Sequence, residues 1–174
     1  DTYEQLYSFT SSMPDIVLGA STCRSDDTRE KLLRTYPPSS CFHLYRRDFV
    51  VNNNLTFPSQ RTSEDSYFVA TCLLLANTWQ VTDYCGYHIF VNPTSVSRTP
   101  NPERYMQKMD VFEALIDFAE RNNVLTENKK ALRQIYFRKG FLLVLKEYIS
   151  NNRPMRWGEI TQIFKRCRIQ LKRL

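Results

Sequence analysis

The first forty residues of the chain predict two short helices. Apolar side chains recur three or four positions apart within residues 1–12 and again from Arg29 to Tyr36, which is the spacing of one face of a helix. Candidate N-cap residues occupy positions 25–28, and Pro37 follows the second helix directly. The N-terminal part is therefore expected to contain helices as well as strands.

From Cys41 onward the pattern changes to that of extended chain. Residues 41–51, 67–77 and 79–91 are rich in aromatic and β-branched side chains, and polar residues 52–66 separate the first of these segments from the second. The pattern predicts three strands. Asn77-Thr78 is the expected turn of a hairpin formed by the last two.

Beyond residue 100 the apolar positions follow helical spacing to the end of the chain. Three helices are predicted, from Asn101 to about Asn122, from Thr126 to about Ile149, and from about Trp157 to the end. Gly140 falls inside the second helix, where it either breaks the helix or is tolerated.

These elements indicate an α+β fold with a small, mostly antiparallel sheet of three or four strands, N-terminal helices and a basic, three-helix C-terminal part. Residues 92–100 consist of turn and polyproline formers and predict a linker between a sheet-rich segment, 1–91, and a helical segment, 101–174. We expect residues 1–174 to form a single domain, because each half alone would be small with a one-sided core.

Composition supports a folded globular protein without a membrane span. Hydrophobic residues make up 42% of the chain and aromatic residues 13%. The longest apolar run, from Tyr67 to Ala76, is interrupted by Thr71 and is much shorter than the roughly 20 residues that a membrane-spanning helix needs.

The positive charge is concentrated in the C-terminal part. Residues 1–100 carry 8 Lys+Arg and 10 Asp+Glu, whereas residues 101–174 carry 16 Lys+Arg and 8 Asp+Glu. Such an asymmetry favours a surface that attracts phosphates or an acidic partner.

The last predicted helix combines an apolar stripe with a wide basic sector. The stripe, which we expect to be buried, consists of Ile160, Ile163, Phe164, Cys167, Leu171 and Leu174. An isoleucine lies in the middle of the basic sector. The predicted binding surface for nucleic acid or a protein partner is therefore Lys165, Arg166, Arg168, Ile169, Lys172 and Arg173. The alternatives are a solvated basic face with one stray apolar residue and an amphipathic membrane-surface helix.

Both histidines of the chain lie close to cysteines. Cys41 and His43 are two positions apart and would share one face of a strand, and the spacing of Cys85 and His88 suits a turn. These four residues are a candidate tetrahedral zinc site. The alternative interpretation of His43, on an aromatic strand, is a hydrogen-bonded core histidine.

The five cysteines are an odd number and are scattered along the chain, which favours a reducing, intracellular location, nuclear or cytoplasmic. The sequon at Asn54 would matter only if the chain were secreted.

No motif identifies a reaction. The four glycines form no phosphate-binding motif, which disfavours nucleotide-cofactor enzymes. The function that we expect is a non-enzymatic interaction module that binds a protein partner, nucleic acid or both through its basic C-terminal helices. The alternative is a hydrolytic enzyme, either a nuclease with a carboxylate such as Asp15 or a cysteine-dependent hydrolase.

Overall fold

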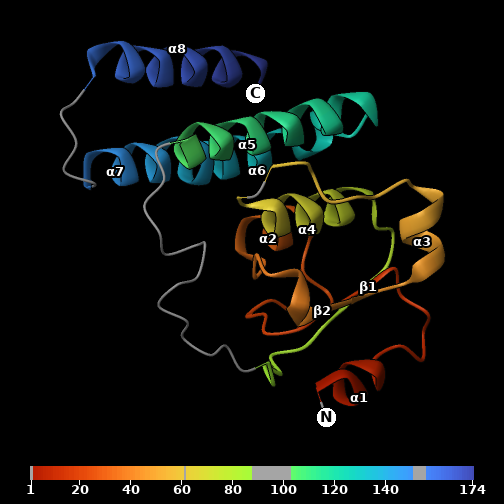
Figure 1. Ribbon diagram of the computed structural model, residues 1–174. Helices are drawn as coiled ribbons and strands as arrows, with labels where there is room; N and C mark the ends of the chain where they lie inside the picture. Colours follow the sequence, from red (N-terminus) through yellow and green to blue (C-terminus); the bar gives the residue numbers. More distant parts are fainter. Residues whose placement is uncertain (1, 61, 88–102, 151–155) are drawn as a thin grey trace. The chain divides into compact units, whose positions relative to one another are not determined.

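The computed structural model describes residues 2–60, 62–87, 103–150 and 156–174 (Figure 1). The chain divides into two compact units. Unit 1 consists of Asp1–Pro58 and Glu64–Phe90, and unit 2 of Ser59–Ser63 and Val91–Leu174. The fold is α+β with a small sheet and several helices, as the sequence predicts.

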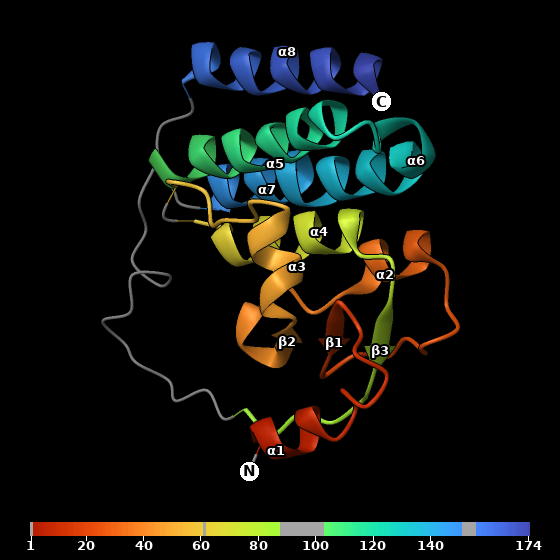
Figure 2. The same cartoon turned by 90° about the vertical axis from the view of Figure 1, so that its right-hand side faces the viewer.

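Unit 1 contains the sheet and the N-terminal helices. Its elements are α1 (Thr2–Tyr7), β1 (Ile16–Leu18), α2 (Arg29–Thr35), η1 (Ser40–Phe42), β2 (His43–Tyr45), α3 (Arg47–Asn52), α4 (Glu64–Leu75) and β3 (Trp79–Val81). The strand order is β2-β1-β3, with β1 antiparallel to β2 and parallel to β3. Figure 2 shows the three strands next to one another.

The central strand β1 organises the core of unit 1. Ile16, Val17 and Leu18 are all buried, which is typical of a strand covered on both faces. Helices α2 and α4 pack against each other, and both carry buried leucines, among them Leu32 in α2 and Leu73 in α4. Helix α2 occupies the predicted segment, and the Thr28 side chain caps it by accepting a hydrogen bond from the backbone N–H of Lys31.

The prediction of a strand at residues 67–77 is wrong, because residues 67–75 lie in helix α4. An uninterrupted apolar run is compatible with either a buried strand or a buried helix, and periodicity alone does not separate them. Every residue from Phe68 to Leu74 is buried, so no polar face marks the helical period. Glu64 and Asp65 in the first turn favour the helix through its dipole.

The other two predicted strands are much shorter than expected. Residues 41–51 form η1, the three-residue strand β2 and helix α3, and residues 79–91 contribute only β3 among those that are described. The predicted hairpin is also wrong. Strand β3 pairs in parallel with β1, with Ile16 opposite Trp79, so the sheet is mixed rather than mostly antiparallel.

A buried carboxylate joins the three strands at one end of the sheet. Asp15 is 4% exposed. Its Oδ2 accepts hydrogen bonds from the backbone N–H groups of Asn77 (2.7 Å) and Thr78 (3.0 Å), and its Oδ1 accepts one from the Arg46 guanidinium (2.6 Å). Asn77-Thr78, expected to be a hairpin turn, instead leads from α4 into β3 and is held by Asp15.

Unit 2 is helical, as predicted. It contains α5 (Glu103–Arg121), α6 (Leu125–Ile135), η3 (Tyr136–Leu142), α7 (Leu143–Ser150) and α8 (Trp157–Arg173). Helices α5 and α8 correspond to the first and third predicted helices. The second predicted helix is a continuous rod made of α6, η3 and α7, in which η3 is a π-helix.

Gly140 lies in the π-helical segment at a place where a larger residue would be crowded. A Cβ at this position would lie 3.1 Å from the Cβ of Phe112 and 3.2 Å from the ring of Tyr136. The glycine therefore permits close packing of η3 on α5, whose Met109, Phe112 and Leu115 form the buried core of unit 2. Gly140 therefore does not break the rod and is tolerated inside it.

Each unit has its own buried apolar side chains, and the predicted linker, residues 92–100, lies outside the described part of the chain. That residues 1–174 form a single domain stays a prediction. Within the described ranges, no helix combines the length and the apolar character that crossing a membrane requires.

We expect Asp15→Ala to lower the free energy of unfolding of unit 1 by about 3 kcal/mol, because it leaves two backbone N–H groups and part of a guanidinium without their acceptor. Urea denaturation followed by Trp79 fluorescence in a Trp157→Phe background measures this. The matched control is Asp26→Ala at an exposed carboxylate, for which a change within about 0.5 kcal/mol is expected. Equal effects of the two substitutions would contradict the role of Asp15.

Candidate functional site

Helix α8 carries the residues predicted to bind a partner, and it lies alongside α5 (Figure 1, Figure 2). Its buried side consists of Ile163, Cys167 and Gln170, followed by the C-terminal Leu174. These positions recur three or four residues apart, as expected for one face of a helix. The buried face confirms the prediction for Ile163, Cys167 and Leu174.

Two of the predicted binding arginines are held by acidic side chains of α5. The Arg166 guanidinium donates to Asp110 (2.6 Å) and to Glu113 (2.9 Å), and its side chain is only 18% exposed. The hydroxyl of Tyr136 in η3 also donates to Glu113 (3.2 Å). Burial raises the pKa of Tyr136 far above its ordinary value, so this hydroxyl stays protonated and remains a donor.

Arg173, at the C-terminal end of α8, makes the same kind of contact. Its guanidinium donates to Asp117 (2.6 Å) and Glu120 (2.7 Å) of α5 and to Gln170 of its own helix (2.7 Å). The expectation that Arg166 and Arg173 belong to a solvent-facing basic surface therefore needs correction. Both arginines form ion pairs with carboxylates of α5, and these ion pairs fix the rotation of α8 about its axis.

The remaining basic residues of α8 face solvent. Lys165, Arg168 and Lys172 are exposed, and none of them forms an ion pair with another described residue. At about 100° per residue they fall within a sector of roughly 60°, and they extend over about 10 Å of the helix. Ile169, 48% exposed, lies beside this row. We call Lys165, Arg168 and Lys172 the cation row.

Phe164 does not lie in the core, contrary to the expectation from the apolar stripe. Its side chain is 50% exposed, and Ile160 is half-buried. Phe164 lies about 90° around the helix from the centre of the buried face. One side of its ring therefore faces solvent, and the other side is covered by apolar residues. There its ring meets that of Phe141 edge to face, with 5.3 Å between the ring centroids.

This contact belongs to an aromatic cluster that the sequence pattern did not predict. Phe141 is buried and also contacts Phe137, with 5.6 Å between centroids. Phe137 and Phe164, the two outer rings, are 39% and 50% exposed. Phe137 and Phe141 were not assigned to any face in the sequence because the π-helical turns of η3 shift the helical period at that point.

The structure places the predicted zinc ligands in different environments. His43 is buried; its Nδ1 accepts a hydrogen bond from the backbone N–H of Gly19 (3.2 Å), so Nε2 carries the proton and donates to the carbonyl of Pro37 (3.0 Å). Both ring nitrogens are thus engaged, which favours the hydrogen-bonded core histidine. Cys41 is half-buried, and Cys85 is exposed.

His88, the fourth predicted ligand, lies outside the described residues. Within the described residues, no three His, Cys, Asp or Glu side chains gather as a metal site would require. Zinc binding by Cys41, Cys85 and His88 stays a prediction, and His43 contributes to it only if its two hydrogen bonds are given up.

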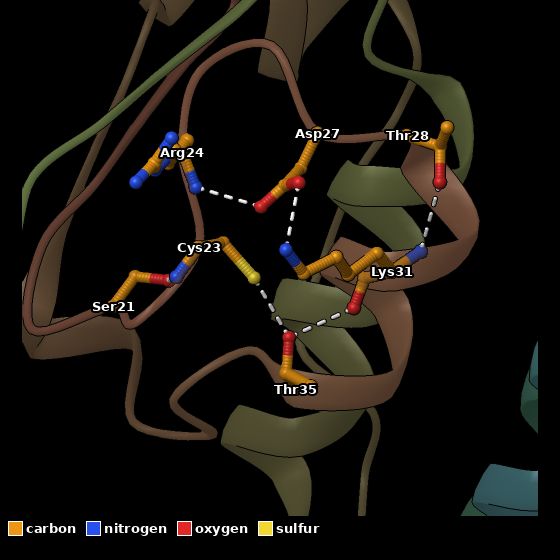
Figure 3. Close-up of polar contacts among 7 residues, drawn as sticks. All are labelled: Ser21, Cys23, Arg24, Asp27, Thr28, Lys31 and Thr35. Carbon is orange, nitrogen blue, oxygen red and sulfur yellow. Dashed lines mark hydrogen bonds and ion pairs between the residues drawn. The ribbon is translucent and has the colours of Figure 1, made fainter.

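The remaining cysteines show no catalytic arrangement. The Cys23 sulfur lies 2.8 Å from the Thr35 hydroxyl oxygen. Figure 3 shows the two side chains pointing toward each other. That hydroxyl donates to the carbonyl of Lys31, so the thiol is the donor to Thr35. Nearby, Asp27 accepts from the Lys31 ammonium and from the backbone N–H of Arg24. The cluster fastens the loop before α2 to the helix, and no histidine base belongs to it.

The other residues considered for hydrolysis are also used structurally. Burial raises the pKa of Cys72 to about 12 and also raises that of Cys167, which keeps both thiols protonated and poorly nucleophilic. Both carboxylate oxygens of Asp15 are hydrogen-bonded within the sheet. The hydrolytic alternative therefore has no constellation of side chains to support it among the described residues.

Comparisons with protein-family models, with curated proteins and with solved structures find no match to this chain. The cation row and the aromatic cluster of unit 2 are therefore the observations from which its function has to be inferred.

The two adjacent residues Ile163 and Phe164 test the orientation of α8. We expect Ile163→Ala to lower the free energy of unfolding of unit 2 by about 2–5 kcal/mol, because it leaves a cavity in the core. Phe164→Ala should cost only about 1 kcal/mol, chiefly from the lost contact with Phe141. Chemical denaturation followed by circular dichroism gives both values. A larger loss for Phe164→Ala than for Ile163→Ala would mean that the helix is rotated.

His43 makes the stability of unit 1 sensitive to mild acid. Burial lowers its pKa, while the hydrogen bond to the carbonyl of Pro37 and the charge of Asp65 act in the opposite direction. A histidine with an ordinary pKa near 6.5 in the unfolded chain takes up a proton that the folded chain resists, so stability is lost as the pH falls below about 6.5.

The free energy of unfolding of unit 1 should therefore decrease as the pH is lowered from about 7 to about 5, and the decrease should be smaller in His43→Gln. Urea denaturation at a series of pH values measures both slopes, with Asp26→Ala as a control that keeps the histidine. Identical slopes for the wild type and His43→Gln would show that His43 does not titrate in this way.

Proposed function

We propose that this chain is a non-enzymatic interaction module that binds nucleic acid, a protein partner or both through the exposed basic face of α8. The observation that carries the proposal is the cation row of Lys165, Arg168 and Lys172. These side chains are exposed, and the ion pairs that the described carboxylates of α5 make go to Arg166 and Arg173 instead.

The arrangement suits recognition of a polyanion. Three cations on one side of a helix present their charges in one direction, so the phosphates of one strand can contact all three. The net charge of residues 101–174 adds a wider positive field that speeds the approach of an anionic partner. Ile169 offers an apolar contact to a sugar, a base or a partner side chain.

The proposed location is intracellular, nuclear or cytoplasmic. All five cysteines are free thiols, and three of them, Cys23, Cys72 and Cys167, are buried. This use of cysteine is typical of a reducing compartment, where thiols are not paired into disulfides.

The cation row is tested by the triple substitution of Lys165, Arg168 and Lys172 with alanine. Binding to duplex DNA and single-stranded RNA should fall, and the slope of log K against log salt should become shallower, by about 0.9 for each lost phosphate contact on duplex DNA. The fold should be retained, since alanine favours helix and exposed cations add little stability. Fluorescence anisotropy across ionic strength measures affinity and slope together.

The matched control replaces Arg121, Lys129 and Arg133 with alanine. These are exposed cations at the end of α5 (Arg121) and along α6 (Lys129 and Arg133), and their removal changes the net charge by the same amount. The control should keep its affinity within about threefold and its salt slope. If the two triple variants lose affinity equally, the chain attracts polyanions only through its net charge and the proposed surface is wrong.

A further inference from the structure

Exposed aromatic rings lie directly beside the cation row. Trp157 is 74% exposed and Phe164 50% exposed, and both belong to α8. At about 100° per residue, Trp157 and Phe164 fall within roughly 20° of one another and Arg168 within roughly 40° of both. The two rings therefore form a ridge along the helix that meets the cation row at Arg168. An aromatic ridge next to a row of cations occupies one continuous stretch of solvent-facing surface.

The rings near the middle of this surface are held in place. Phe164 is braced edge to face by the buried Phe141, which also contacts Phe137. The partly exposed rings of Phe137 and Phe164 are therefore fixed from behind by a core residue. A ring that is already fixed loses little side-chain entropy when a planar group stacks on it. A stray exposed apolar residue would not need such bracing.

The combination favours one class of polyanion. In a duplex the bases are stacked on each other, and their faces are closed to side chains. A duplex would therefore contact the cation row but would offer no base face to the aromatic rings. An unpaired strand offers both phosphates and free base faces. Proteins that bind single strands combine cations along the backbone with aromatic rings under the bases. An acidic protein would complement the charges, but it has no specific use for flat, exposed aromatic rings.

We propose that the exposed face of α8 binds single-stranded nucleic acid, with phosphates on Lys165, Arg168 and Lys172 and bases stacked on Phe164 and Trp157. This inference rests on the proposed function and deepens it. Phe137, which continues the cluster through Phe141, supplies a further surface for a neighbouring base. Binding of this kind is tolerant of sequence, because every base has a face that can stack.

The experiment compares substitutions of Phe164 that separate stacking from apolar contact. Phe164→Leu keeps an apolar side chain but removes the ring, and Phe164→Trp keeps an aromatic surface. Binding is measured by fluorescence anisotropy with a labelled single-stranded oligonucleotide of mixed sequence and with the same strand annealed to its complement. The control is Tyr7→Ala, which removes a 71% exposed ring from unit 1.

We expect Phe164→Leu to weaken single-strand binding at least about fivefold, and Phe164→Trp and Tyr7→Ala to leave it within about twofold. The salt slope should not change in Phe164→Leu, because no phosphate contact is lost. Duplex binding should be weaker than single-strand binding and insensitive to the ring. In a Trp79→Phe background, Trp157 emission should be quenched by the single strand, which reports stacking without any change to Phe164.

Equal affinity for single strand and duplex, wild-type affinity in Phe164→Leu, or unchanged Trp157 emission on saturation would overturn the stacking inference. The proposed function would then still stand on the effect of the cation-row substitutions. Binding to an acidic peptide without measurable oligonucleotide binding would also overturn the inference and would assign the surface to a protein partner. If the wild type bound neither the oligonucleotides nor the acidic peptide, both the stacking inference and the proposed function would be overturned.

Discussion

Ion pairs between α8 and α5 decide which part of the C-terminal helix faces solvent. Arg166 and Arg173 are seven residues apart and both reach carboxylates of α5, so together they set the rotation of α8 about its axis. With that rotation fixed, Ile163 and Cys167 enter the core and the cation row points outward. Removal of one arginine would leave carboxylates such as Glu113, which is only 20% exposed, without their partner.

The π-helical segment η3 gives the same surface its aromatic component. Its wider turns bring Phe141 under Phe164 while Tyr136 reaches Glu113, the carboxylate that also holds Arg166. Gly140 makes this packing feasible by allowing η3 to approach Phe112 of α5. Packing of the core, pairing of the arginines and bracing of the exposed ring are thus parts of one arrangement within unit 2.

The sheet of unit 1 shows why long-range pairing could not be read from the chain. The segments before and after Asn77-Thr78 suggested a hairpin. Instead, the carboxylate of Asp15, some sixty residues earlier, accepts hydrogen bonds from the backbone N–H groups of Asn77 and Thr78, and β3 lies alongside β1. A continuous apolar run such as Phe68–Leu74 carries no periodic signal, because burial on all sides removes the polar face that would distinguish helix from strand. His43 likewise finds its partners, Gly19 and Pro37, only through folding.

The sequence by itself determined the α+β class, helix α2, the helices α5 and α8, the rod of residues 125–150, and the excess of positive charge in residues 101–174. These follow from local spacing, capping and composition. Tertiary structure alone decided that Arg166 and Arg173 pair with α5, that Phe164 is exposed, and that Asp15 joins the strands. The physical reason is that a charge or a ring has no fixed role until a partner from a distant segment either neutralises and covers it or leaves it to solvent.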